Sequence, residues 1–135
     1  MTDITILTCQ KYLQPGDSLY DQNILLERKL LTDALEARGL NVACRSWDDP
    51  DYDWTQTRAV VFRTIWDYYK RFDEFSAWLE EVKTKTQLVN PYELITWNVD
   101  KHYLADLETK GIAIVPTAFV DTGSYRSIND VCKSK

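Results

Sequence analysis

A short segment, FRTIWDYY, combines side chains that could recognise a small charged molecule. Arg63 offers a fork of N–H donors for a carboxylate, and Asp67 can accept hydrogen bonds from an ammonium group. The rings of Trp66 and Tyr68 would supply flat apolar walls, a combination that suits an amino-acid-like ligand. A purely structural alternative is that Arg63 and Asp67 pair with each other and that Trp66 belongs to the core. We predict substrate contacts from Arg63, Thr64, Trp66, Asp67 and Tyr68.

A second group of polar residues follows the first apolar run of the chain. Tyr12 and Asp17 lie in the loop after residues 4–9, which should open onto the same edge of a sheet as the segment above. We therefore add Tyr12 and Asp17 to the predicted substrate-binding residues. Asp21, at the end of this loop, is expected to cap a helix rather than to bind a ligand.

Several kinds of chemistry are excluded by counting. The chain has one histidine, His102, and three widely spaced cysteines, so histidine triads, multi-histidine metal sites and structural zinc sites cannot form. Its four glycines form neither of the glycine-rich phosphate loops. The aspartates of residues 49–53 have the spacing of a calcium loop, but the required glycine and glutamate are missing. We predict no metal site and no catalytic residue.

Composition narrows the partners further. The chain has 135 residues, 44% of them hydrophobic and 27% charged, as expected of one compact domain. A formal net charge of -5 without a basic stripe argues against binding to nucleic acid or to an anionic membrane. No signal peptide and no apolar run of spanning length is present, and the cysteines are expected to be reduced and inert, so the cytoplasm is the expected location.

Strands and helices alternate along the chain, which is typical of an α/β fold with a mostly parallel sheet of about five strands and helices on both faces. The predicted strands are residues 4–9, 42–47, 59–63, 87–89 and 112–116. The predicted helices are residues 21–39, residues 72–82, a short helix starting at residues 90–93, and a helix capped by Asn98 that ends at Gly111.

Six spaced motifs, in order between residues 4 and 120, resemble the N-terminal region of ATP-grasp ligases of the bacterial glutathione-synthetase-like and cycloserine-ligase-like group. They are WDDP at residues 47–50, RTIWDY at 63–68, FSAWL at 75–79, NP at 90–91, WNVDK at 97–101 and VPT at 115–117. The resemblance implies a Rossmann-like pre-ATP-grasp domain over residues 1–120. Residues 121–135 would then begin the following ATP-grasp region.

The same resemblance implies the substrate side of an ATP-dependent carboxylate-amine ligase that uses ATP and Mg²⁺. Lys101, after Asp100 and at an expected helix start, matches a lysine that reaches the nucleotide phosphates in this family. Because the regions that clamp ATP and hold the metal would follow residue 135, this chain alone is expected neither to bind these cofactors tightly nor to catalyse ligation, and it is expected to be a shortened form. The alternative is a non-catalytic α/β module that binds a small molecule or a protein. Apolar surface left by missing regions would favour a homodimer.

Overall fold

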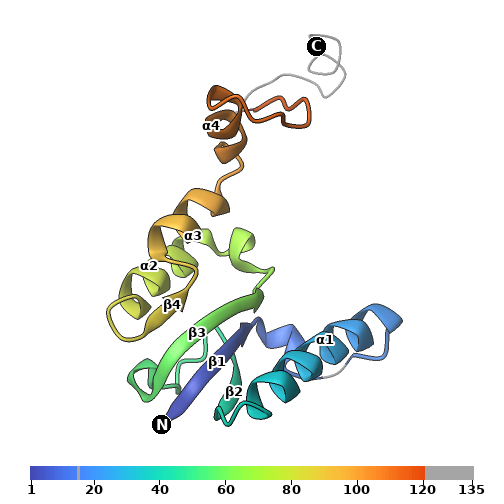
Figure 1. Cartoon of the computed structure of the whole chain (residues 1–135), viewed down its shortest axis with the longest axis vertical. Helices are drawn as coiled ribbons and strands as arrows, with labels where there is room; N and C mark the ends of the chain where they lie inside the picture. The colour runs from blue at the N-terminus through green and yellow to red at the C-terminus, as the bar shows by residue number, and fades with distance from the viewer. Residues whose placement is uncertain (15, 121–135) are drawn as a thin grey trace. The chain divides into compact units, whose positions relative to one another are not determined.

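The computed structural model describes residues 1–14 and 16–120 of the chain. Its centre is a parallel sheet of four strands in the order β2-β1-β3-β4 (Figure 1). The strands are β1 Thr2–Thr8, β2 Val42–Ser46, β3 Thr57–Thr64 and β4 Gln87–Val89. The predicted α/β class with a parallel sheet is confirmed.

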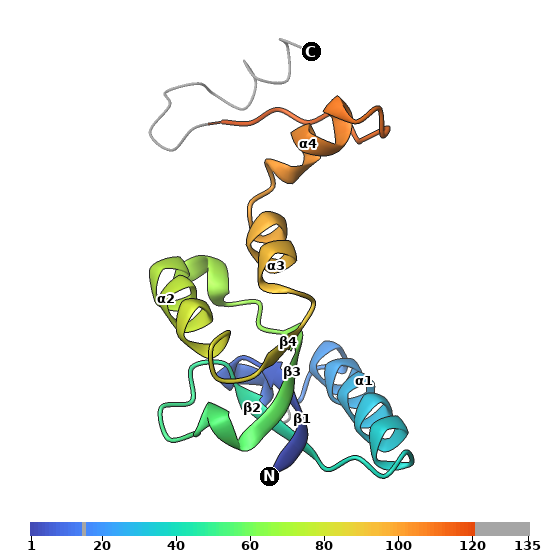
Figure 2. The same cartoon turned by 60° about the vertical axis from the view of Figure 1, so that its left-hand side comes forward.

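The described residues contain four α-helices: α1 Leu19–Glu36, α2 Phe72–Val82, α3 Tyr92–Val99 and α4 Tyr103–Thr109. The chain divides into two compact units, residues 1–92 and residues 93–135. In the first unit, α1 and α2 lie on opposite faces of the sheet (Figure 2). None of the helices in the described residues is both long and apolar enough to cross a membrane.

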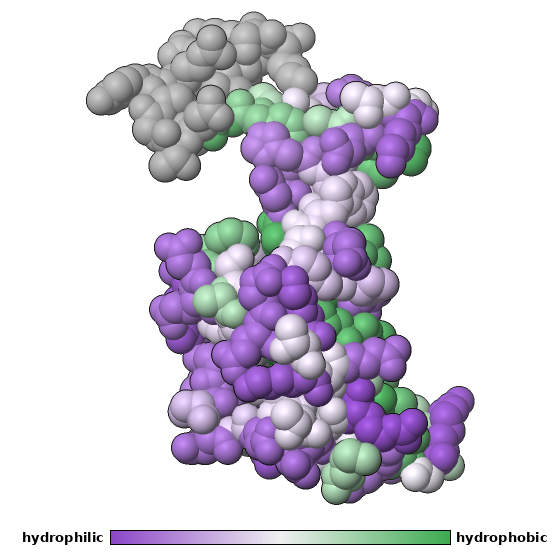
Figure 3. Space-filling view, turned by 90° about the vertical axis from the view of Figure 1, so that its left-hand side faces the viewer, coloured by the Kyte–Doolittle hydropathy of each residue, from purple (hydrophilic) through white to green (hydrophobic). Residues whose placement is uncertain are grey.

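The core of the first unit has two parts because both faces of the sheet are covered. Ile6 of β1 faces α1, where it lies beside Ile24 and Leu31. On the opposite face, an aromatic cluster joins the residues that follow β2 to α2: the ring of Trp47 packs edge-on against Phe75 and Trp78. The outer surface on this side, seen in Figure 3, is largely hydrophilic, as expected of a helix that turns its apolar stripe inward.

Helix α1 begins with a cap that differs from the predicted one. Ser18, not Asp21, is the N-cap: its Oγ accepts a hydrogen bond from the backbone N–H of Asp21 at 3.0 Å. The same hydroxyl donates a hydrogen bond to the Asp21 carboxylate. The predicted end is confirmed, since Gly39 has a φ of 80°, the left-handed conformation that glycine adopts without strain.

The expected fifth strand, residues 112–116, is wrong: this stretch is irregular in the described chain. Ile112 and Val115 are 50% and 79% exposed, and β-branched residues form a strand only where a partner edge is available. The predicted cap at Asn98 is also wrong, because Asn98 lies inside α3, and the helix is interrupted between Val99 and Tyr103, where α4 begins. The expected region 121–135 lies outside the described residues.

Candidate functional site

The topology of the sheet places a crevice between the carboxyl ends of β1 and β3. From β1 the chain passes into α1 on one face, and from β3 it passes into α2 on the other face. The two loops therefore diverge, which is the arrangement in which open α/β sheets bind ligands. A cavity of about 260 Å³ opens here, which we call the switch-point pocket. It is lined by Cys9, Lys11, Tyr12, Trp66, Asp67, Tyr69 and Lys70.

Aromatic rings form the walls of the switch-point pocket. Tyr12 is buried and meets the ring of Trp66 edge-on, with 5.6 Å between the ring centroids. Trp66 also packs beside Tyr20 at the start of α1, with 6.2 Å between the ring centroids, yet it remains 44% exposed. The Tyr12 turn is tied to α1, because Arg28 donates a hydrogen bond of 2.7 Å to the Tyr12 carbonyl. An apolar surface in a fixed position is therefore open to a ligand.

The switch-point pocket carries both signs of charge. Asp67 presents a half-buried carboxylate from the turn after β3, and Lys11 and Lys70 bring amines from the two loops. The Lys11 Nζ lies 3.4 Å from the Tyr12 hydroxyl oxygen, to which it donates, and 3.8 Å from the Asp21 carboxylate. The hydrogen bond to Tyr12 and the nearby Asp21 charge raise the pKa of Lys11 above its ordinary value. A molecule with an ammonium and a carboxylate would find a partner for each.

The Asp67 carboxylate is oriented by residues from other parts of the first unit. The indole Nε1 of Trp47 donates a hydrogen bond of 2.9 Å to Asp67 Oδ1. Arg71 places Nη1 3.8 Å from Asp67 Oδ2, while the same atom lies 2.5 Å from Asp48 Oδ2. Burial raises the pKa of Asp48, but hydrogen bonds from Arg71 and Ser46 outweigh it and hold the pKa below its ordinary value.

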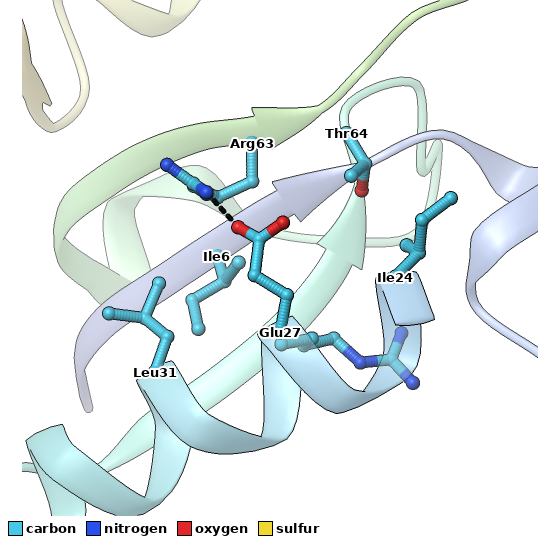
Figure 4. Close-up of a pocket in the computed structure, with 7 residues that line it drawn as sticks. Ile6, Ile24, Glu27, Leu31, Arg63 and Thr64 are labelled. Carbon is cyan, nitrogen blue, oxygen red and sulfur yellow. Dashed lines mark ion pairs between the residues drawn. The ribbon is translucent and has the colours of Figure 1, made fainter. Parts of the chain in front are cut away.

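Arg63 lies away from this pocket. Its guanidinium forms an ion pair with Glu27 of α1, above a separate cavity of about 10 Å³ that Ile6, Ile24 and Leu31 help to line (Figure 4). That volume holds about one water molecule and is too small for an amino-acid-like ligand. Alternation along β3 explains the placement: Phe62 packs on Trp78 of α2, so the next residue, Arg63, points to the α1 side of the sheet. In the described residues Arg63 therefore pairs with Glu27, and not with Asp67 as the structural alternative proposed.

Three other predicted residues also lie outside the lining of the switch-point pocket. The hydroxyl of Thr64 is buried and lies 2.6 Å from that of Thr8. Tyr68 packs on Phe75, with ring centroids 5.3 Å apart. Asp17 is exposed in the loop before α1. Of the seven predicted substrate-binding residues, the structure brings together Tyr12, Trp66 and Asp67.

Lys101 belongs to the second unit and precedes α4 by two residues. It is exposed, and its Nζ lies 5.4 Å from the centroid of the Tyr103 ring. Asp100 lies in the turn between α3 and α4, where its carboxylate accepts a hydrogen bond from the backbone N–H of His102, so Lys101 lies immediately before the His102 N-cap of α4. The helix after it has only seven residues.

Four pocket residues were not predicted: Cys9, Lys11, Tyr69 and Lys70. Each lies within three positions of Tyr12 or Tyr68 in the sequence, so proximity in sequence was the available signal. Burial, together with the nearby Asp67 charge, raises the pKa of the Cys9 thiol, which disfavours the thiolate form. Across residues 1–14 and 16–120, no group of three or more acidic, histidine or cysteine side chains could hold a metal ion.

Comparisons with known proteins agree on one family. Residues 4–90 match the family described as D-cycloserine synthetase DcsG, N-terminal domain. The chain is 39% identical over 105 residues to the cycloserine biosynthesis protein DcsG of Streptomyces lavendulae, a match that covers 78% of this chain and 33% of the relative. The crystal structure of D-cycloserine synthetase DcsG matches with a TM-score of 0.70 and 35% identity, over 90% of this chain and 38% of that one. The match thus spans about a third of the length of the curated relative.

Proposed function

Because the chain belongs to the family of the D-cycloserine synthetase DcsG N-terminal domain, we propose that it is the substrate-side domain of an ATP-dependent carboxylate-amine ligase of the ATP-grasp type. Its role is to bind a small amino-acid-like or carboxylate substrate in the switch-point pocket. The observation that carries this proposal is the meeting of the Asp67 carboxylate, the Lys11 and Lys70 amines and the Tyr12 and Trp66 rings in one crevice at the carboxyl ends of β1 and β3.

The size and chemistry of the pocket favour a small zwitterion. A volume of about 260 Å³ is below the range of about 300–1,000 Å³ typical of drug-sized ligands. Asp67 would accept hydrogen bonds from the ligand ammonium, and Lys11 or Lys70 would meet its carboxylate. Trp66, half open to solvent, would cover an apolar part of the ligand.

ATP and Mg²⁺ chemistry would have to be supplied from outside the described residues. Phosphoryl transfer requires several cations around the transferred group, and Lys101 is a single exposed amine. No acidic cluster suited to a metal exists in residues 1–14 and 16–120. We therefore assign no step of the ligase reaction to this chain and restrict its proposed role to holding the substrate.

Calorimetry with serine tests the proposal, because the relative is named for the synthesis of cycloserine. D-serine and L-serine should bind, and Asp67→Asn, which removes the charge with little change in shape, should weaken binding by about tenfold or more. Lys11→Met should weaken binding by removing a carboxylate partner. Arg63→Ala is the matched control: it removes a charged side chain that lies outside the pocket and should change affinity by less than about twofold.

Two results would contradict the proposal. If the wild-type protein bound neither serine enantiomer at millimolar concentration, the proposed amino-acid-like ligand would be ruled out. Loss of binding in Arg63→Ala with unchanged binding in Asp67→Asn would move the site to the α1 side of the sheet, around the small cavity beside Glu27.

A further inference from the structure

The Asp67 carboxylate enters the switch-point pocket from the turn after β3, but a residue from another strand end holds it. Trp47 directly follows β2, 20 residues earlier in the chain, and its Nε1 donates to Asp67 Oδ1 at 2.9 Å. We infer that Trp47 is a positioning residue, whose indole N–H orients Asp67 to accept the ammonium group of the ligand. This inference rests on the function proposed above.

The indole of Trp47 is well suited to this role because its ring is buried and packed against other side chains. It is 1% exposed and packs edge-on against Phe75 and Trp78, at centroid distances of 5.5 and 5.8 Å. The Arg71 guanidinium covers the ring at 4.9 Å, and the backbone N–H of Trp47 donates to the Thr8 carbonyl at 3.0 Å. A buried indole needs an acceptor for its one N–H, and Asp67 supplies it.

Asp67 lines the switch-point pocket and keeps acceptor capacity beyond its bond to Trp47. An ionised carboxylate has about four acceptor positions on its two oxygens, and Trp47 uses one of them, on Oδ1. Arg71 lies 3.8 Å from Oδ2, beyond hydrogen-bonding distance, because Asp48 and Glu74 hold its guanidinium. Oδ2 therefore keeps positions for a ligand N–H, and its direction is set by the bond at Oδ1.

Trp78 provides a matched control within the same aromatic cluster. It also has a buried Nε1, but this atom has no hydrogen-bond partner among the described residues. Trp47→Phe and Trp78→Phe each replace an indole by a phenyl ring in this aromatic cluster. They differ in that only Trp47→Phe removes the hydrogen bond to Asp67.

Binding measurements separate positioning from a general structural role. The probes are serine and 3-hydroxypropionate, which has the same carboxylate and hydroxyl but no ammonium. Trp47→Phe should weaken serine binding about tenfold and reduce the preference for serine over 3-hydroxypropionate by the same factor. Trp78→Phe should leave the affinity for serine within about twofold of the wild type. Unchanged serine affinity in Trp47→Phe, or the same loss in both variants, would overturn the inference.

A second measurement needs no ligand. In the free protein, Asp67→Ala should move the indole N–H resonance of Trp47 upfield, as expected when a hydrogen bond to an anion is lost, and should leave the Trp78 indole resonance in place. An unmoved Trp47 resonance would overturn the inference even if serine binds. If the wild type binds no serine, the proposed function fails and the ligand role of Trp47 fails with it, whereas the resonance shift still reports the contact itself.

Discussion

Replacing Thr8 with valine should destabilise the first unit by about 1–2 kcal/mol, because it leaves the Thr64 hydroxyl buried without a partner. Thr8 and Thr64 are 1% and 8% exposed, and their hydroxyl oxygens lie 2.6 Å apart at the ends of β1 and β3. A buried unpaired hydroxyl costs about 1–3 kcal/mol. The added methyl group recovers roughly 0.8 kcal/mol of this cost.

The double substitution Thr8→Val with Thr64→Val should be far less destabilising than the sum of the single changes. In that variant both hydroxyls are gone and two methyl groups face each other, so no polar group is left unpaired. We expect a free energy of unfolding within about 1 kcal/mol of the wild type, and a coupling energy of about 1–3 kcal/mol between the two positions.

Urea denaturation followed by tryptophan fluorescence measures these differences, since Trp47, Trp54 and Trp78 lie together in the first unit. With a slope of about 2 kcal/mol per molar urea, each single variant should lower the midpoint by about 0.5–1 M. Additive losses in the double variant would refute the reasoning, because they would mean that the hydroxyls do not satisfy each other. The same result would weaken the assigned pairing of Thr8 with Thr64 at the carboxyl ends of β1 and β3.

Three further predictions concern the frame around the pocket. Ser18→Ala should lower the free energy of unfolding by about 1 kcal/mol through loss of the cap on Asp21, and an unchanged denaturation midpoint would contradict this assignment. Gly39→Ala should cost about 1 kcal/mol in the same assay, because alanine is strained at a φ of 80°, and a stabilised variant would be inconsistent with the left-handed turn. The lowered pKa of Asp48 means that its pairing with Arg71 stabilises the fold above the ordinary carboxyl pKa and is lost as the pH falls through the lower folded value. Between pH 7 and pH 3 the wild type should therefore lose more stability than Arg71→Gln, and equal losses would show that this pairing does not affect folding.

The elements of the first unit were largely predictable because each depends on neighbours in sequence. The apolar run of residues 59–63 and the helical spacing of Phe75, Leu79 and Val82 are local patterns, and the structure confirms a strand and a helix there. The N-cap of α1, which was predicted at Asp21 and lies at Ser18, also depends only on residues close in sequence. Ser18 precedes Asp21 by three residues, and serine is a preferred N-cap residue that could have been recognised there.

The fifth strand failed for a different reason. Residues 112–116 have the composition of a strand, but a strand also requires a partner edge, and composition does not reveal whether one is available. The same limitation applies to Lys101, whose expected helix start depends on where α3 ends and α4 begins.

By itself, the sequence determined the α/β class, the positions of four strands, and the expectation that the residues after β1 and β3 meet, because the carboxyl ends of parallel strands share one edge. It could not determine which side chains share a pocket. Only the tertiary structure decided that Arg63 pairs with Glu27, that Lys11 joins Tyr12 and Trp66 in the lining, and that Trp47 holds Asp67. Those outcomes depend on strand register and on contacts between residues far apart in the sequence, such as Tyr12 and Trp66, which no local pattern encodes.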